Sequence, residues 1–477
     1  MRRTARVALL IGVTLSVLSA AEPRAAAKPV TAEAAASGFR LPPPTRTLLK
    51  NGLTVLVVEN HAIPLIQIQM LVKTGAAADP SGKEGVAALT ARLLKRGTAK
   101  RPAPQFAQEV EFVGGSIETV AGRDGTLVIG EFASRDVEVA MSLISDMVLS
   151  PAFGQEEVAR EQRLALAGIQ ALPDDPEELA RQAFAAWLYG SHPYGRPVEG
   201  TKRSLAALTR ADLAAFYEAR YAPNNAVLAI VGDIGATQAA QRADKYFGPW
   251  KKRTVPELRL PEAVPVKGRK VLLIDKPDAT QSQIRLGNVA LRRGDPEYFP
   301  LLVGNTILGG GFTSWLVEEV RVKRGLTYGI RSTLDAQRAA GSAGIATFSK
   351  NQSVLETIQV ALEQVRRMRQ GEIPPEDLDK ARSFLAGLFP LHIESPDALA
   401  GQILDIELYG LEPDYINQYQ KKVRGIGLDA VKRAARLLPL DDLAIVVVGP
   451  AAALKEGLAT LGPVTVKPAE TVLEPAP

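Results

Sequence analysis

The sequence of 477 residues contains no cysteine and only three histidines. Without cysteine, the chain can form no disulfide, no thiolate metal site and no thiol nucleophile. His61, His192 and His392 stand in none of the spacings that bring imidazoles to one metal ion. We therefore interpret the three histidines as loop or packing residues, and we predict that this chain binds no metal or other cofactor.

Long apolar runs are also absent, apart from a short one at the N-terminus. Arg2, Arg3 and Arg6 precede the apolar run 7–18, and small residues follow at 19–21, which is typical of a secretory signal over residues 1–21. The run is too short for a spanning helix, so we predict no membrane span in the mature chain, with an uncleaved anchor as the alternative. We expect a periplasmic or otherwise exported protein.

A strong excess of charge is lacking as well. The formal net charge is +5, and removal of the three signal arginines leaves +2. No clustered basic face is evident in the sequence, so we predict no nucleic-acid partner. The mature chain has the composition of an ordinary globular protein.

The sequence repeats itself in outline. Residues 54–60 resemble 270–276, an offset of 216, and residues 228–232 resemble 445–449, an offset of 217. Two distant matches at nearly one offset indicate a duplication of a unit too long for a solenoid repeat. We predict a mobile leader at 22–45, a domain at 46–249, a Pro- and Lys-rich linker at 250–267, a homologous domain at 268–470 and a tail at 471–477.

Hydrophobic periodicity predicts an α+β fold in each half, with a mostly antiparallel sheet flanked by helices. The expected strands lie at 53–58, 65–72, near 117, at 127–132 and at 226–231. The expected helices lie at 84–95, 105–113, 137–149, 156–172, 354–370 and 375–388.

The segment 309–328 combines several features of a functional loop. Gly309, Gly310 and Gly311 allow a close backbone approach, and a predicted helix over 314–322 follows, capped by Thr313 or Ser314. Its apolar stripe is Leu316, Val317 and Val320, and Gly325 ends it. Arg321 and Tyr328 could then reach one groove, although an arginine and a tyrosine near a helix end are more often a helix-end cation and a core aromatic.

Several motifs in order give the chain a family resemblance. They are Asn51-Gly-Leu-Thr-Val, Gly114-Gly-Ser, His192-Pro-Tyr-Gly-Arg, Tyr221-Ala-Pro-Asn-Asn, Thr280-Gln-Ser-Gln and the segment from Gly309 to Tyr328. Together they resemble the pitrilysin-type (insulinase) metallopeptidases, which include mitochondrial processing peptidases. The resemblance implies two domains that form half of a clam-shell chamber. It also implies that Arg321 and Tyr328 bind substrate and complete a zinc site on another domain or subunit, and that Gly309, Gly310, Gly311 and Phe312 line the substrate path.

The zinc site itself is missing from the resemblance. In catalytic members a helix carries His-x-x-Glu-His, and a Glu on a later helix completes the ligands. Alignment on Gly85 and Gly97-Thr98 places Ala88, Ala91 and Arg92 at the first His, the Glu and the second His, and Gly168 at the last ligand. Alanine and glycine offer no donor atom, and an arginine would place a cation where Zn²⁺ should sit.

The resemblance therefore implies an accessory subunit whose partner is a homologous, zinc-bearing peptidase subunit, with a peptide as substrate. The alternative is a non-catalytic peptide-binding or scaffold protein of the same fold. A peptidase that works alone is disfavoured because the metal ligands and the general base are all replaced.

Overall fold

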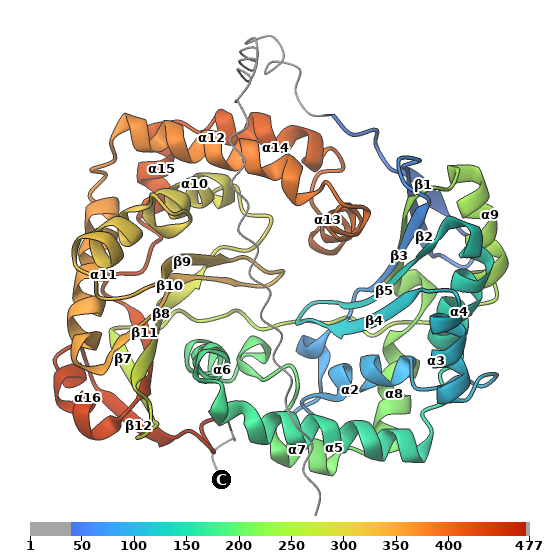
Figure 1. Ribbon diagram of the computed structural model, residues 1–477, viewed down its shortest axis with the longest axis horizontal. Coiled ribbons are helices and arrows are strands. Elements are labelled where there is room, and N and C mark those ends of the chain that lie inside the picture. Colours follow the sequence, from blue (N-terminus) through green and yellow to red (C-terminus); the bar gives the residue numbers. More distant parts are fainter. Residues whose placement is uncertain (1–39, 474–477) are drawn as a thin grey trace, which may run out of the picture. The chain divides into compact units, whose positions relative to one another are not determined.

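The computed structural model describes residues 40–473. The signal 1–21, most of the predicted leader and the last four residues lie outside the described residues. Two six-stranded sheets, each flanked by helices, make up the fold (Figure 1), so the predicted α+β class is confirmed. Of the part described, no helix is both long and apolar enough to cross a bilayer.

The first sheet has the order β1-β2-β6-β3-β5-β4, in which only β2 and β6 pair in parallel. Its strands are β1 (Thr45–Leu48), β2 (Thr54–Glu59), β3 (Leu65–Val72), β4 (Ser116–Ala121), β5 (Thr126–Ala133) and β6 (Ala226–Gly232). The helices of this half are α2 (Val86–Leu94), α3 (Ala103–Phe112), α4 (Val137–Leu149), α5 (Gln155–Ala171), α6 (Pro176–Tyr189), α7 (Lys202–Ala207), α8 (Arg210–Arg220) and α9 (Ala236–Phe247).

The second sheet has the order β12-β7-β11-β8-β10-β9, with three antiparallel pairs at the β9 end. Its strands are β7 (Arg269–Asp275), β8 (Gln281–Ala290), β9 (Ile330–Asp335), β10 (Gly341–Lys350), β11 (Leu443–Gly449) and β12 (Val464–Pro468). The helices are α10 (Tyr298–Gly309), the π-helix η6 (Val317–Lys323), α11 (Val354–Arg369), α12 (Pro375–His392), α13 (Pro396–Tyr409), α14 (Tyr415–Arg424), α15 (Leu428–Ala435) and α16 (Ala451–Ala459).

The two sheets repeat one register. Val55 of β2 lies opposite Leu228 of β6, and Val271 of β7 lies opposite Ile445 of β11, as the offsets in the sequence require. Five strands correspond in this way. The outermost strands differ, because β1 comes from the N-terminal side and pairs antiparallel, whereas β12 comes from the C-terminal end and pairs in parallel.

One face of each sheet packs against helices of its own half of the chain. A helix from the other half covers the opposite face. On β3, alternation points Ile66, Ile68 and Met70 into the first core and Gln67 and Gln69 to the other face. Helix α13, from the second half, covers that other face by packing on β3 and β6.

Helix α6 makes the reciprocal exchange. It belongs to the first half in sequence, but it packs on β8 and β11 of the second sheet. Leu179, Ala180 and Ala183 of α6 are buried in one cluster with Leu272 and Val446. The linear domain boundaries predicted from sequence therefore do not describe the packing of these two helices.

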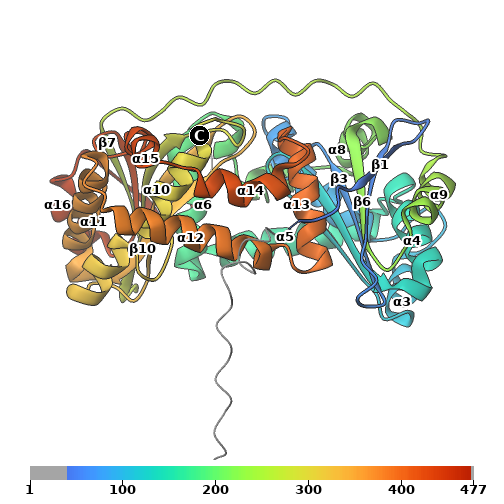
Figure 2. The same cartoon turned by 90° about the horizontal axis from the view of Figure 1, so that it is seen from above.

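Two segments outside the helices and strands complete the described chain, the linker and the end of the leader. Residues 251–267 form neither helix nor strand, and Figure 2 shows them as the long irregular segment between α9 and β7. The described end of the predicted leader contacts α14, since the Leu41 N–H and carbonyl bond the side-chain amide of Asn417 at 2.9 and 3.1 Å.

Candidate functional site

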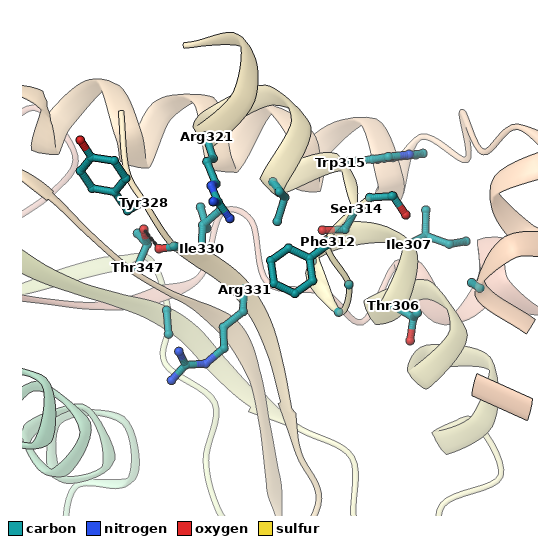
Figure 3. A pocket seen from close by; sticks show the side chains of 18 of the residues that line it. Thr306, Ile307, Phe312, Ser314, Trp315, Arg321, Tyr328, Ile330, Arg331 and Thr347 are labelled. Carbon is teal, nitrogen blue, oxygen red and sulfur yellow. Dashed lines mark hydrogen bonds between the residues drawn. The ribbon is translucent and has the colours of Figure 1, made fainter. Parts of the chain in front are cut away.

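A cavity of about 780 Å³ lies beside the end of α10. Arg321, Tyr328 and all four residues of the predicted substrate path line it (Figure 3). The structure therefore brings together every residue that the sequence assigned to this half-site. The remaining lining comes from α10, residues 313–317, β8, β9, β10 and α12, from Gly329, and from Glu177 of α6.

The three glycines have different surroundings. A Cβ on Gly309 would lie 2.4 Å from the backbone nitrogen of Ser332 in β9, and one on Gly310 would lie 2.8 Å from the Cα of Thr306. A Cβ on Gly311 would meet nothing within 4 Å. Close packing thus requires glycine at the first two positions, while the third faces open space.

Phe312 follows the glycines with its side chain in the cavity. It is 85% exposed, which is unusual for a phenylalanine. In Figure 3 its ring projects from the loop toward the side chains of Arg321 and Arg331. The cavity therefore offers an uncovered aromatic surface.

The helix that carries Arg321 differs from the prediction. Only Trp315 and Leu316 are α-helical. The chain then continues as a π-helix from Val317 to Lys323, and no side chain of residues 40–473 caps its start. The hydroxyl of Ser314 is buried without a hydrogen-bond partner in the described chain, so the predicted cap is wrong. The predicted apolar stripe is confirmed, since Leu316, Val317 and Val320 are buried. Short π-helical segments are frequent at functional sites.

Arg321 and Tyr328 both present exposed side chains to this cavity. Gly325 ends the helix with φ of 62°, and the Leu326 N–H bonds the Val320 carbonyl at 3.0 Å. Within residues 40–473, no group forms a hydrogen bond or ion pair with the Arg321 guanidinium or the Tyr328 hydroxyl. Figure 3 shows the two side chains on neighbouring segments, with Ile330 next to Arg321. Their polar ends are available to a ligand.

The backbone around Tyr328 is fixed although its side chain is free. The Gly329 N–H donates to the Thr327 hydroxyl at 3.0 Å, and the Thr347 hydroxyl donates to the Gly329 carbonyl at 2.9 Å. Thr327 is buried, whereas Tyr328 is 77% exposed. The Tyr328 side chain is therefore exposed, while hydrogen bonds fix the backbone that carries it. A catalytic group needs such a fixed position.

Trp315 anchors the helix of Arg321 to its neighbours. Its indole N–H donates to the Asp377 carboxylate in α12 at 2.8 Å, and the Arg367 guanidinium of α11 lies 3.9 Å from the ring centroid. The side chain is buried. We expect it to act on the position of Arg321 more than on a substrate.

The cavity also contains charged residues that the sequence argument did not identify. Arg285 of β8 and Arg331 of β9 both contact Glu177, at 3.5 and 3.3 Å. Burial lowers the pKa of Arg285, and the nearby positive charge of Arg331 lowers it further. No sequence signal pointed to Glu177, because its helix belongs to the other half of the chain. Gln283, from the motif at residue 280, lines the same cavity.

The positions that match the zinc motif lie on α2 and α5, which pack together. Ala88 and Ala91 are buried, and the Arg92 guanidinium forms an ion pair with Glu199. A Cβ on Gly168 would face open space. Glu161, one helical face before Gly168 on α5, is buried and accepts a hydrogen bond from Arg96 at 2.7 Å. Its carboxylate is therefore already paired within the chain.

These residues do not fit a zinc ion. Neither alanine nor glycine has a donor atom, and Arg92 brings a cation to the position of an imidazole. Among residues 40–473, no three His, Cys, Asp or Glu side chains are grouped so that they could hold a metal.

Two of the three histidines make contacts that fix the structure around them. Nδ1 of His192 accepts from the Tyr194 N–H at 3.0 Å, so Nε2 donates to the Pro261 carbonyl of the linker, also at 3.0 Å. Burial lowers the pKa of His192. His61 lies 2.7 Å from Asp233 at the surface. His392 is the exposed last residue of α12.

Comparison with known proteins identifies related sequences along most of the chain. A family model described as insulinase (peptidase family M16) matches residues 54–202, and one described as peptidase M16 inactive domain matches residues 207–385. An uncharacterized zinc protease of Mycobacterium leprae is 27% identical over 413 residues, covering 86% of this chain and 92% of that protein. An uncharacterized zinc protease of Bacillus subtilis is 23% identical, covering 85% and 98%.

Solved structures agree in fold. A crystal structure described as a peptidase M16 inactive domain from Pseudomonas fluorescens superposes with a TM-score of 0.80 at 28% identity, covering 85% of this chain and 98% of that one. A protease from Helicobacter pylori superposes with a TM-score of 0.79 at 21% identity, covering 86% of this chain and all of that one.

Proposed function

The chain belongs to the M16 (insulinase) peptidase family, and on that premise we propose that it is the zinc-less subunit of a heteromeric metallopeptidase. In this proposal the partner is a homologous subunit that carries His-x-x-Glu-His and the zinc ion. One observation carries the proposal. Arg321 and Tyr328 have exposed side chains with no hydrogen-bond or ion-pair partner among residues 40–473, while the zinc positions of the same chain hold Ala88, Ala91, Arg92 and Gly168.

The two side chains have chemistry that a zinc site can use. When bound in the partner, zinc supplies an activated water for attack on a peptide bond. The Tyr328 hydroxyl would donate a hydrogen bond to the carbonyl oxygen on which negative charge develops. Arg321 would hold a backbone carbonyl of the peptide and keep the tyrosine turned toward the reacting bond. Both groups work only if the ligand enters the cavity beside residues 309–312.

We further propose that the mature chain acts outside the cytoplasm, in a periplasm or an equivalent exported location. The support is the basic and apolar pattern of residues 1–21. A fusion of residues 1–40 to a reporter that fluoresces or reacts only after export would test this directly.

A non-catalytic peptide-binding or scaffold role is the second candidate. The observation that favours it is the cavity itself, which lies in this chain and presents the exposed rings of Phe312 and Phe384. Such a surface could bind an unfolded peptide with no partner present. This role would leave the tyrosine hydroxyl without a catalytic use.

A native pull-down separates the two roles. We expect the tagged mature chain to retain a partner with an intact His-x-x-Glu-His, and the eluate to cleave an unstructured quenched-fluorescence peptide. A chelator should abolish that cleavage. Recovery of the chain alone, or only with proteins that are not peptidases, and no cleavage would instead establish the scaffold role.

A further inference from the structure

The floor of the cavity carries two arginines in one row of the second sheet. Ala346 of β10 lies opposite Arg285 of β8 on one side and opposite Arg331 of β9 on the other. Residues directly opposite each other across strands point to the same face of a sheet, and neighbouring strands lie about 4.8 Å apart. The two arginines thus flank a small side chain, about 10 Å apart at their Cα atoms.

The positive charges near Arg285 and Arg331 outnumber the carboxylates that could neutralise them. Glu177 is the one carboxylate of the described chain that forms ion pairs with Arg285 and Arg331, and it serves both at 3.5 and 3.3 Å. Arg321 and Lys380 also line the cavity. Its other acid, Asp377, is engaged by the Trp315 indole and by Lys380. The lining therefore holds four cations and two carboxylates.

The first half of the chain shows that the fold does not require this excess. Gln69 lies opposite Ala229 in β6, and Arg285 lies opposite Val446 in β11, so they occupy equivalent positions in the duplicated sheets. At the first site the acid of the covering helix is Asp397, and it accepts hydrogen bonds from Gln67 and Gln69 at 3.0 and 2.7 Å. Two neutral glutamine side chains are therefore enough to bind the acidic first turn of α13 to its sheet. The second sheet does not need arginines for the same purpose.

We propose that the row Arg285–Ala346–Arg331 binds a carboxylate of a peptide ligand. The exposed rings of Phe312 and Phe384 would take an apolar side chain next to it. The carboxylate belongs either to an acidic side chain or to the C-terminus of the peptide. This inference deepens the proposed function and rests on it, because it takes the cavity as the place where peptide is held.

Glu177 would then compete with the ligand for the same guanidinium groups. Its side chain is 59% exposed and its ion pairs are long for charge-assisted hydrogen bonds, so it can give way. A ligand carboxylate that approaches Ala346 would meet two arginines and one opposing acid. Removal of that acid should strengthen binding.

The test is fluorescence anisotropy with the mature chain and three labelled peptides of one apolar sequence. One carries an internal Glu and an amidated C-terminus, one carries Gln and a free C-terminus, and one carries Gln and an amide. We expect one of the first two to bind about tenfold or more tightly than the third, as one charge-assisted contact allows. Which one binds tightly identifies the source of the carboxylate.

Variants then locate the contact. Arg331→Gln should remove the preference for the carboxylate and leave the third peptide unaffected. Glu177→Gln should tighten binding of whichever carboxylate peptide the wild-type chain prefers, severalfold. Glu178→Gln is the matched control, since the neighbouring Glu178 pairs with Arg181 and does not line the cavity.

Equal binding of all three peptides would overturn the inference, as would weaker binding of the preferred carboxylate peptide to Glu177→Gln. Absence of any peptide binding to the isolated chain would overturn it as well. None of these results bears on the Tyr328 hydroxyl, which is tested separately by cleavage in the presence of the partner.

Discussion

Residues in the cavity combine exposed side chains with closely packed backbone, and the glycine loop shows where each condition applies. The sequence Gly-Gly-Gly cannot show which glycine faces the solvent. Only the approach of Ser332 in β9 assigns the packing role to Gly309 and leaves Gly311 open.

Gly309→Ala should destabilise the fold by about 1–3 kcal/mol, because the added methyl overlaps the backbone of Ser332 and the side chain of Leu316. Gly311→Ala is the control and should leave the urea midpoint nearly unchanged. Equal midpoints for the two variants would show that the approach to β9 is not as close as described.

His61 provides a prediction about pH. Its hydrogen bonds to Asp233, chiefly, and to Glu59 raise the pKa of the imidazole. The folded pKa exceeds the unfolded value of about 6.5, so the stabilisation is fully present below that pH and is lost as the pH rises through the folded pKa.

Asp233→Asn should therefore move the His61 pKa back toward about 6.5, as followed by NMR of the imidazole protons. The His61→Gln variant assigns the resonance. A pKa that does not fall in Asp233→Asn would mean that the pair does not form in solution.

The sequence predicted those residues of the cavity that lie in one local motif, and it missed those that come from distant segments. Arg321, Tyr328 and the glycines lie within twenty residues of one motif, so their closeness in sequence predicted that they line one cavity. Glu177, Arg285 and Arg331 come from segments far apart in sequence, and no local pattern joins them.

Helices and strands followed the hydrophobic pattern where each packs within its own half. The strands at 65–72 and 226–231 and the helix at 137–149 lie where alternation and helical spacing placed them. Helix η6 shows the limit, because an apolar stripe at Leu316, Val317 and Val320 suits both an α-helix and a π-helix. The segment packs against α11 and β9, and neither contact can be read from the local sequence.

The exchanged helix α13 gives a prediction at this scale. Asp397→Ala would leave the buried amide of Gln67 without its acceptor and cost about 1–3 kcal/mol in the free energy of unfolding. Asp397→Asn keeps one oxygen acceptor and should cost clearly less. Urea unfolding measures both, and equal costs would argue against this docking contact.

Residues 40–473 contain two copies of a five-stranded unit, each extended by a different outer strand, and the two halves exchange a helix. The duplication was visible in the sequence because buried strands keep their apolar residues, and the repeated register bears it out. The exchange was not visible, because an amphipathic helix shows that it packs but does not show on which sheet.

The exchange predicts that the halves hold together without the linker. A protease site inserted at the exposed residues 251–254 should give two fragments that still elute as one species in native gel filtration. Helix α6 buries Leu179 and Ala183 on the second sheet, and α13 covers the first. Two separate peaks under native conditions would contradict this packing.

The most direct test of the central claim is the cleavage rate of the reconstituted pair with wild-type chain and with Tyr328→Phe. Tyr328 is 77% exposed, so the substitution should leave the thermal unfolding midpoint unchanged. We predict a fall in kcat of roughly 10²–10³, as for loss of one oxyanion donor, with little change in KM. An unchanged kcat in the folded variant would show that this chain does not supply the hydroxyl to its partner's zinc site.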